Sequence, residues 1–291
     1  MLMRVALILF AIGLGCLAQA QTVRFSGKLP ACTATPPSQA TAAGYHTLVM
    51  CNAMTDNSQV DRNATTNPWF QWYATGFGYA MSSGVFSNDG TGMSISTSPG
   101  NGGGPYTVDI NSAGNIVSGN YVTGGYYAEI TATFNPATCQ QAPNSWPAAV
   151  WAASPASFIA GAGGSEFVEI DSFEWLNCQS VAAVHDWSGS GVLNCTNSDA
   201  VLTYTPDSNP HVYGMLFITT TSGGGTGTIS HYIDNVLQNT LTYTTSGKPD
   251  PAGTCGNGAF STADTQQWAF ALQAGTGVPV KYSGFHVWQA P

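Results

Sequence analysis

Short runs in which apolar and polar residues alternate recur along the chain, and turn-forming segments separate them. Clear examples are the runs 92–96, 125–134, 212–218 and 229–234. A period of two places successive side chains on opposite faces of a β-strand, so these runs predict half-buried strands. The segments between them are rich in Gly, Asn, Ser and Pro, which are typical of turns and loops. We find no 3.6-residue apolar stripe and no repeat of fixed period, so the pattern predicts an all-β chain.

Many short strands joined by turns favour an antiparallel β-sandwich or jelly roll. Residues 21–45 contain Pro30, Pro36 and Pro37 among small residues, and we expect them to form an N-terminal arm. The rest of the chain, residues 46–291, is expected to be a single domain, because β-sandwiches of this size are routine. Its long, Gly-rich loops are the places where a binding cleft would obtain its walls.

The first twenty residues have the pattern of a secretory signal peptide. Arg4 precedes an apolar run from Val5 to Leu17, and the segment ends on Ala18-Gln19-Ala20, an A-x-A cleavage signal. The apolar run is short for a membrane-spanning helix, which needs about 20 residues. We therefore expect residues 1–20 to be removed and the mature protein to be secreted or periplasmic, without a membrane partner.

The cysteine pattern agrees with export. Six cysteines follow the predicted cleavage site: Cys32, Cys51, Cys139, Cys178, Cys195 and Cys255. An even number in an exported chain predicts disulfides, and we expect Cys178 and Cys195 to bridge a loop. A metal cluster would need closely spaced Cys or His pairs, which the sequence does not contain. Neither a metal site nor a cofactor is predicted.

Charge is scarce in this chain. Its 291 residues include 6 Lys and Arg and 15 Asp and Glu, so 7% are charged and the formal net charge is −9. An ordinary soluble domain has roughly 25% charged residues. A nucleic-acid partner is excluded, because it requires a basic surface to displace counterions from phosphates. A hydrophobic content of 43% also argues against disorder.

The few glutamates are concentrated in one place. The chain has four, Glu129, Glu166, Glu169 and Glu174, and three of them lie in the segment 166–174. Concentrated carboxylates repel one another, and acidic residues are depleted in strands. A chain that avoids charge elsewhere and accepts it here points to a functional cluster.

The spacing of these acids can be followed along a strand. Glu169 and Asp171 are two residues apart and share a face, and a β-bulge at Ser172-Phe173 would return Glu174 to that face. The carboxyl groups of the two glutamates could then approach to about 5 Å, the separation that a retaining glycosidase needs. Asp171 would hydrogen-bond the nucleophile and help to separate the pKa values of the group. Calcium binding or a solvated acidic face are the alternatives.

The segment EIDSFE, from Glu169 to Glu174, resembles the E-x-D-x-x-E catalytic strand of glycoside hydrolase family 16 in its bulged, laminarinase-like form. Further segments resemble other strands of that family and occur in the same order: GYYAEI at 125–130, WPAAVW at 146–151, VHDW at 184–187, HVYG at 211–214, ISHYID at 229–234 and YSGFHVWQ at 282–289. The match spans most of the predicted domain.

The resemblance implies a concanavalin A-like jelly roll with a carbohydrate-binding cleft on its concave sheet. It also implies Glu169 as the nucleophile, Asp171 as its partner and Glu174 as the acid/base. The substrate-binding residues that it suggests are Trp146, Trp151, Glu129, Trp175 and His185, although core packing remains an alternative for the tryptophans. At Thr131, Ala271 and Lys281 the family often carries Arg, Asn and Asp. Because that Asp is sometimes tied to a structural calcium, Lys281 weakens the expectation of calcium.

The charge distribution favours a neutral substrate. No Lys or Arg lies between Arg62 and Lys248, the stretch expected to form the cleft. Sulfated galactans would ordinarily require basic side chains there, and so would a polysaccharide lyase that neutralises a uronate. We therefore expect a monomeric endo-acting retaining β-glycosidase on a β-1,3- or β-1,3/1,4-glucan. A neutral galactan, a transglycosylase with the same site and a non-catalytic lectin-like sandwich are the alternatives.

Overall fold

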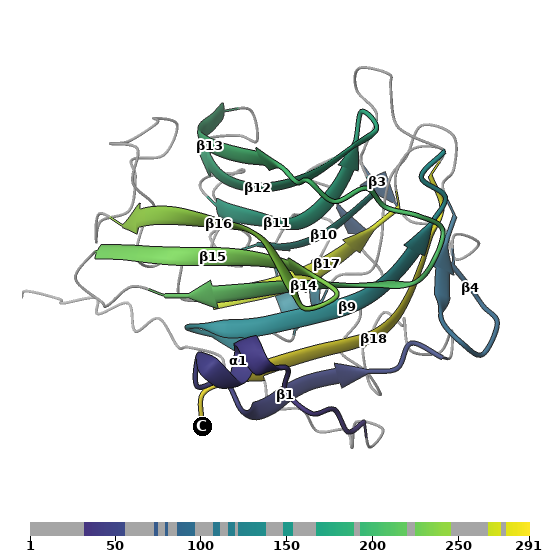
Figure 1. The fold of residues 1–291 in the computed structure, drawn as a ribbon, viewed down its shortest axis with the longest axis horizontal. Coiled ribbons are helices and arrows are strands. Elements are labelled where there is room, and N and C mark those ends of the chain that lie inside the picture. Colours follow the sequence, from purple (N-terminus) through teal and green to yellow (C-terminus); the bar gives the residue numbers. More distant parts are fainter. Residues whose placement is uncertain are drawn as a thin grey trace, which may run out of the picture.

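Two antiparallel β-sheets face each other and enclose the core in the computed structural model (Figure 1). The structure describes residues 32–55, 73–74, 79–80, 86–96, 107–110, 116–119, 122–137, 148–153, 167–188, 193–219, 225–245, 267–274 and 278–291. For some strand residues, Trp151 among them, the description covers the backbone and not the side chain.

The larger sheet has eight strands in the described part of the chain. Seven lie in the order β16-β15-β14-β9-β18-β5-β4, and β1 pairs with β18. Their bounds are β1 Thr47–Asn52, β4 Phe86–Asn88, β5 Met93–Ile95, β9 Tyr126–Phe134, β14 His211–Ile218, β15 Gly225–Ile233, β16 Val236–Thr245 and β18 Val280–Gln289. The order brings strands from both ends of the sequence to the middle of one sheet, as a jelly roll does.

The smaller sheet has six strands among the described residues, in the order β13-β12-β11-β10-β17-β8. Their bounds are β8 Val122–Thr123, β10 Ala148–Ala153, β11 Phe167–Leu176, β12 Gln179–Ser188, β13 Leu193–Val201 and β17 Gln267–Gln273. Two short pairs stand apart from both sheets: β2 Tyr73–Ala74 with β3 Tyr79–Ala80, and β6 Val108–Ile110 with β7 Ile116–Gly119. The predicted antiparallel β-sandwich jelly roll is confirmed.

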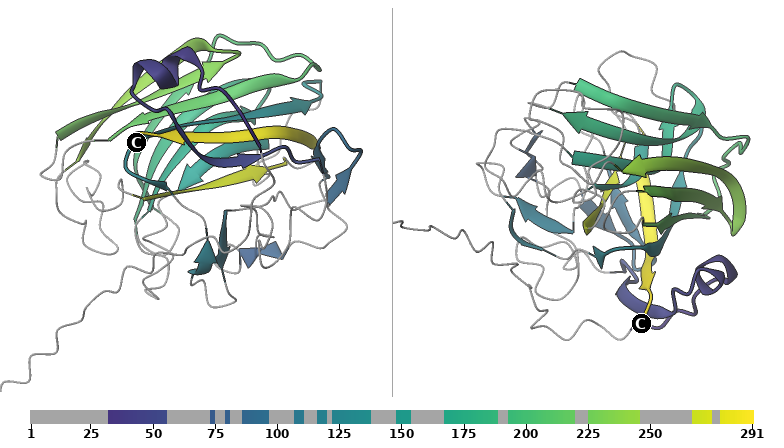
Figure 2. Two further views of the ribbon diagram at one scale, coloured as in Figure 1. Left: turned by 90° about the horizontal axis from the view of Figure 1, so that it is seen from below. Right: turned by 90° about the vertical axis from the view of Figure 1, so that its left-hand side faces the viewer.

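The strands of both sheets bend in the same sense (Figure 1). We call the outer face of the six-stranded sheet the concave face and the outer face of the eight-stranded sheet, on which α1 (Ser38–Ala42) packs, the convex face. The two further views in Figure 2 show the same layers from below and from the side.

Aromatic side chains fill the space between the sheets. Tyr126 on β9 lies edge-on to Phe270 on β17, with ring centroids 5.1 Å apart. Phe173 on β11 and Tyr213 on β14 join the sheets with centroids 4.3 Å apart. Because each large aromatic side chain buries about 150–250 Å², such pairs dominate the cohesion of the sandwich. The core is aromatic because inward positions of the alternating strands carry Tyr, Phe and Trp.

The N-terminal arm packs on the convex face. Its helix α1, Ser38–Ala42, follows a pair of prolines and ends before Gly44, whose φ of 82° only glycine adopts without strain. Ala40 of α1 is buried with Tyr127, Leu216 and Trp288 in a second, smaller apolar cluster on the outside of the sheet. The part of the predicted arm before residue 32, like the predicted signal peptide, lies outside the described residues.

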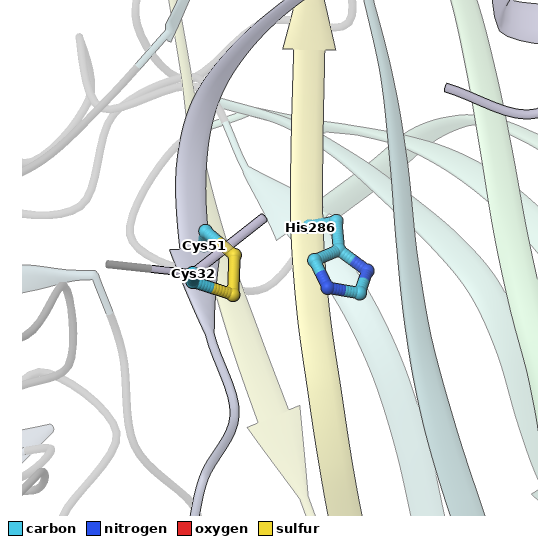
Figure 3. A group of neighbouring side chains, drawn as sticks. All are labelled: Cys32, Cys51 and His286. Atoms are coloured by element: carbon cyan, nitrogen blue, oxygen red, sulfur yellow. A yellow bond between two sulfur atoms is a disulfide. The ribbon is translucent and has the colours of Figure 1, made fainter. Parts of the chain in front are cut away.

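Two cysteines tie the arm to the sheet. Cys32 and Cys51 form a disulfide beside His286 of β18 (Figure 3). Their sulfur atoms and a ring nitrogen of His286 lie within 4.8 Å of one another. The sulfurs bond to each other and are therefore not thiolates, the form in which cysteine binds a metal.

The predicted bridge between Cys178 and Cys195 is wrong. Cys178 is disulfide-bonded, but it lies in the turn between β11 and β12, whereas Cys195 pairs at the far end of β12, between the partners of Asp186 and Trp187. Eight residues at about 3.3 Å each separate the two positions, and a disulfide requires Cα atoms within about 7 Å.

Within the described residues, no helix is both long enough and apolar enough to cross a membrane.

Candidate functional site

The acidic motif lies on β11, and the strand contains the predicted bulge. Asp171 pairs with Ala183 of β12 and Glu174 pairs with Val181, so Ser172 and Phe173 together oppose one residue. The ladder to β10 shifts at the same place, between the partners of Asp171 and Phe173. An extra residue reverses the parity of every side chain that follows it. This bulge confirms the prediction from spacing.

All three acids of the motif lie on the concave face, and the bulge is what brings Glu174 there. Val168 and Ile170 before the bulge, and Phe173 and Trp175 after it, belong to the core. Their neighbours Glu169 and Glu174 are half-buried, and Asp171 is 2% exposed. Because Ser172 and Phe173 both face inward, alternation resumes with Glu174 pointing outward. The sequence brings the acids near one another, and the bulge turns Glu174 in the direction of the other two.

A tight turn fixes the position of the neighbouring strand. Asn177 and Cys178 join β11 to β12, and both have positive φ angles, 50° and 61°. Two such residues form the hairpin turn whose twist matches that of the flanking strands. The resulting register pairs Glu169 with His185. His185 therefore reaches the site because of a turn eight residues away.

His185 contacts the central acid of the motif. Its Nε2 lies 3.1 Å from Oδ2 of Asp171, and its side chain is 15% exposed. The sequence predicts His185 as a substrate-binding residue, whereas its contact in the structure is with a member of the acidic cluster. The strand motif VHDW locates this residue, but only the register reveals its partner.

One ligand atom each from Asp171, Glu174 and His185 lies within 4.8 Å of the others. At that separation and an effective dielectric constant of about 20, two ionised carboxylates repel by about 3 kcal/mol or more. A cation bound between the three groups would offset this repulsion, and the nitrogen ligand suits a transition metal better than calcium, which prefers oxygen.

Glu129 is not part of this cluster. It lies on β9 of the other sheet, where its neighbours Ala128 and Ile130 point into the core. Its side chain faces the convex side, and its Oε1 is 3.3 Å from Nδ1 of His286. The prediction of Glu129 as a residue of the cleft does not agree with this position, because the resemblance gave its strand but not which sheet face it occupies.

Of the three predicted tryptophans, the structure describes the side chain of Trp175 only. Trp175 is 5% exposed and packs on Phe134, with ring centroids 5.9 Å apart, so it is a core residue and not a platform for a sugar. Trp151 pairs with Asp171 across β10 and β11, and its side chain is outside the description. Trp146 lies outside the described residues. The two remain predictions.

The one described Lys or Arg side chain binds residues outside the acidic motif of β11. Among the described residues, Lys281 of β18 is the only Lys or Arg, and its Nζ donates to Asp89 Oδ2 at 2.7 Å and to Thr91 Oγ1 at 2.6 Å. The hydrogen bond from Lys281, followed by those that the backbone N and Oγ1 of Thr91 donate to Oδ1, holds the pKa of Asp89 well below its usual range. Lys281 thus ties β18 to the turn between β4 and β5.

Comparisons with known proteins bear on the fold. No family model and no curated protein matches the chain. Among solved structures it is similar to an endo-1,3-beta-glucanase from Streptomyces sioyaensis, with 15% identity over 89% of this chain and 100% of that one and a TM-score of 0.53. An alginate lyase from Aplysia kurodai matches with 10% identity over 84% and 100% of the chains and a TM-score of 0.43. A glucuronan lyase from Trichoderma reesei has 15% identity, coverage of 70% and 84%, and a TM-score of 0.38. The likeness to the glucanase shows a shared β-sandwich jelly roll.

Proposed function

We propose that the protein is an exported, endo-acting, retaining β-glycosidase that hydrolyses a neutral polysaccharide. One observation carries the proposal: the bulge in β11 brings Glu174 to the concave face, which Glu169 and Asp171 already share by alternation. A retaining glycosidase needs two carboxyl groups about 5 Å apart, one as nucleophile and one as acid/base. The fold shared with a glucanase is compatible with this chemistry without specifying it.

In the proposed reaction, the Glu169 carboxylate attacks the anomeric carbon while protonated Glu174 donates its proton to the leaving glycosidic oxygen. A covalent glycosyl-enzyme results. Glu174, now a carboxylate, takes a proton from water, which attacks the same carbon and releases Glu169. The β-configuration is retained because the carbon is inverted twice.

Asp171 and His185 would act on the two glutamates. The contact of 3.1 Å between His185 Nε2 and Asp171 Oδ2 orients the buried carboxylate. Asp171 would hydrogen-bond the nucleophile, as the spacing predicts, and its charge would discourage ionisation of Glu174 before the leaving group is protonated. One acid can thus remain protonated while the other is ionised.

We propose a β-1,3- or mixed β-1,3/1,4-glucan as the substrate. The stretch between Arg62 and Lys248 contains no Lys or Arg to neutralise a sulfate or a uronate. Trp151, paired with Asp171 in the backbone register, and Trp146 are the proposed stacking platforms. The same absence of cations disfavours lyase chemistry, which must stabilise charge next to a carboxylate.

The test is reducing-sugar release from laminarin, mixed-linkage glucan and agarose by the wild type and by Glu169→Gln. We expect release from a glucan, loss of at least about 10³-fold in kcat for the variant because covalent catalysis is removed, and a β-anomer as the first product by NMR. Glu129→Gln is the matched control, because Glu129 lies on the convex face of the other sheet. Binding without turnover on all three polymers would favour the lectin-like alternative, and full activity of Glu169→Gln would overturn the mechanism.

A further inference from the structure

The connection from β13 to β14 crosses from the six-stranded sheet to the eight-stranded sheet. We call it the crossing segment; it comprises residues 202–210 and ends at His211, the first residue of β14. At its start the backbone N of Leu202 donates to the carbonyl oxygen of Ser180 on β12, at 2.8 Å. Near its other end Asp207 contacts the ring of His211. A titratable side chain therefore helps to attach the crossing segment to the second sheet.

His211 lies between two carboxylates. Its Nδ1 is 2.6 Å from Oδ2 of Asp234, in the turn between β15 and β16, and its Nε2 is 2.9 Å from Oδ1 of Asp207. Hydrogen bonds from His211 and then from Asn209 lower the pKa of Asp207, which is therefore ionised where an imidazole titrates. A carboxylate accepts hydrogen bonds and donates none, so both ring nitrogens must donate. This arrangement requires a protonated imidazole.

The other groups around the ring do not titrate in the same range of pH. On the neighbouring strand β9 the partner of His211 is Ala132, which is apolar. Tyr204 of the crossing segment lies edge-on to the imidazole, with ring centroids 5.3 Å apart, and burial raises the pKa of its phenol to about 12. Burial would lower the pKa of His211, but hydrogen bonds to Asp234 and Asp207 raise it overall. Within the described residues, the charged groups that face the ring are thus the two aspartates.

The two aspartates are not held equally. Asp234 also accepts the backbone N–H of Val212 through Oδ1, at 2.9 Å, so it is tied to β14 apart from the histidine. Asp207 accepts its other hydrogen bonds from the backbone and side chain of Asn209, which lies in the same segment. Its side chain is 58% exposed, so water can replace the imidazole. When the ring loses one proton, the N–H toward Asp234 is therefore retained, and Asp207 faces a lone pair.

We propose that His211 is a pH-sensitive latch, which holds the crossing segment against the eight-stranded sheet while the imidazole is protonated and releases Asp207 when the imidazole is neutral. The contribution of the latch is fully present below pH 6.5, the ordinary pKa of an imidazole in an unfolded chain. It is lost as the pH rises through the higher pKa of the folded protein. Because the ion pairs are partly exposed, the effect is a local opening of the segment and not unfolding of the sandwich. The inference does not depend on the proposed hydrolysis.

Limited proteolysis by chymotrypsin, which cleaves after Tyr204, measures release of the crossing segment. The side-chain amide in His211→Gln imitates a neutral imidazole, because it donates from one end only. We expect this variant to be cleaved after Tyr204 about fivefold faster than the wild type at pH 6, as loss of an exposed ion pair allows, and at the wild-type rate at pH 8.5. Comparing the two proteins at one pH removes the pH dependence of the protease itself.

His46→Gln is the matched control, because it replaces an exposed histidine outside the crossing segment. It should be cleaved after Tyr204 at the wild-type rate at both values of pH. Equal rates of His211→Gln and the wild type at pH 6 would overturn the latch, and so would the same ratio of rates at pH 6 and pH 8.5.

NMR titration of the His211 ring tests its two contacts separately. The midpoint should lie above about pH 6.5 in the wild type and fall in Asp207→Asn and in Asp234→Asn, which keep the shape of the side chain without its charge. Asp207→Asn should also be cleaved as fast as His211→Gln at pH 6, so the test holds even where the histidine variant does not fold. A wild-type midpoint that neither substitution lowers contradicts the proposal. Neither readout uses a substrate, so a failure to cleave any polymer would count against the proposed function alone.

Discussion

Acidification is expected to destabilise the folded protein through His231. In the folded state burial lowers the pKa of this imidazole to about 4, whereas in an unfolded chain it is about 6.5. Between these values the unfolded chain binds the proton and the folded protein does not, so the free energy of unfolding falls as the pH falls. The contribution is fully present above pH 6.5 and is lost progressively toward pH 4. A difference of about 2.5 pKa units at 1.36 kcal/mol each gives about 3 kcal/mol.

Urea denaturation at pH 7, 5.5 and 4 measures this contribution. The free energy of unfolding of the wild type should fall between pH 7 and pH 4 by about 3 kcal/mol more than that of His231→Phe. Comparing the two proteins removes the contributions of all other groups that they share. One of these is His211: burial would lower its pKa, but hydrogen bonds to Asp234 and Asp207 raise it overall. Its stabilisation is present below pH 6.5 and is lost as the pH rises, opposite in sign to that of His231.

His46→Gln is the matched control, because His46 is exposed and its loss removes one imidazole without opening the core. It should leave the difference between pH 7 and pH 4 as in the wild type. Equal pH dependence of the wild type and His231→Phe would refute the argument that a neutral imidazole is held in the core. A wild type whose stability is constant from pH 7 to pH 4, compared with a falling His231→Phe, would refute its sign.

Three further changes test the fold. Replacing Cys32 and Cys51 by Ser opens a loop with a sequence separation of 19. It should lower the free energy of unfolding, measured by urea denaturation, by about 3 kcal/mol. An unchanged urea midpoint would show that the disulfide does not restrain the arm. Gly214→Ala should lower the free energy of unfolding by about 1–3 kcal/mol, because a Cβ there meets the ring of Tyr127. Adding Tyr127→Leu to this variant should recover part of the lost stability in thermal melts. Phe173→Ala should lower the free energy of unfolding by about 3–5 kcal/mol, since Phe173 is 2% exposed and lies in the core. A decrease below about 1 kcal/mol would contradict its role in joining the sheets.

Local pattern determined the strands and the bulge. Alternation between 125 and 134 predicted β9, and the spacing of Glu169, Asp171 and Glu174 predicted an extra residue at Ser172-Phe173, which the ladder confirms. These features depend on which way successive side chains point, and that is decided within a few residues. The same parity also determines Trp175: if the bulge turns Glu174 outward, its neighbour must face the core. Its prediction as a substrate-binding residue overlooked this consequence.

Features that depend on contacts between distant segments came only from the tertiary structure. Alternation shows that Glu129 and Ala128 face opposite sides of a strand, but it does not show which sheet that strand joins or which of its faces the arm covers. Cys178 and Cys195 are close in sequence, yet an antiparallel ladder carries them to opposite ends.

The position of His231 is the clearest case. The sequence predicts a strand histidine and nothing more, whereas the packing of the two sheets buries its ring, which is 1% exposed. The sequence by itself thus determined the all-β class, the bulged acidic strand and the shortage of charge. Sheet order and sheet-to-sheet packing decided which polar side chains are buried and which strands are neighbours, because burial and register are properties of the whole chain.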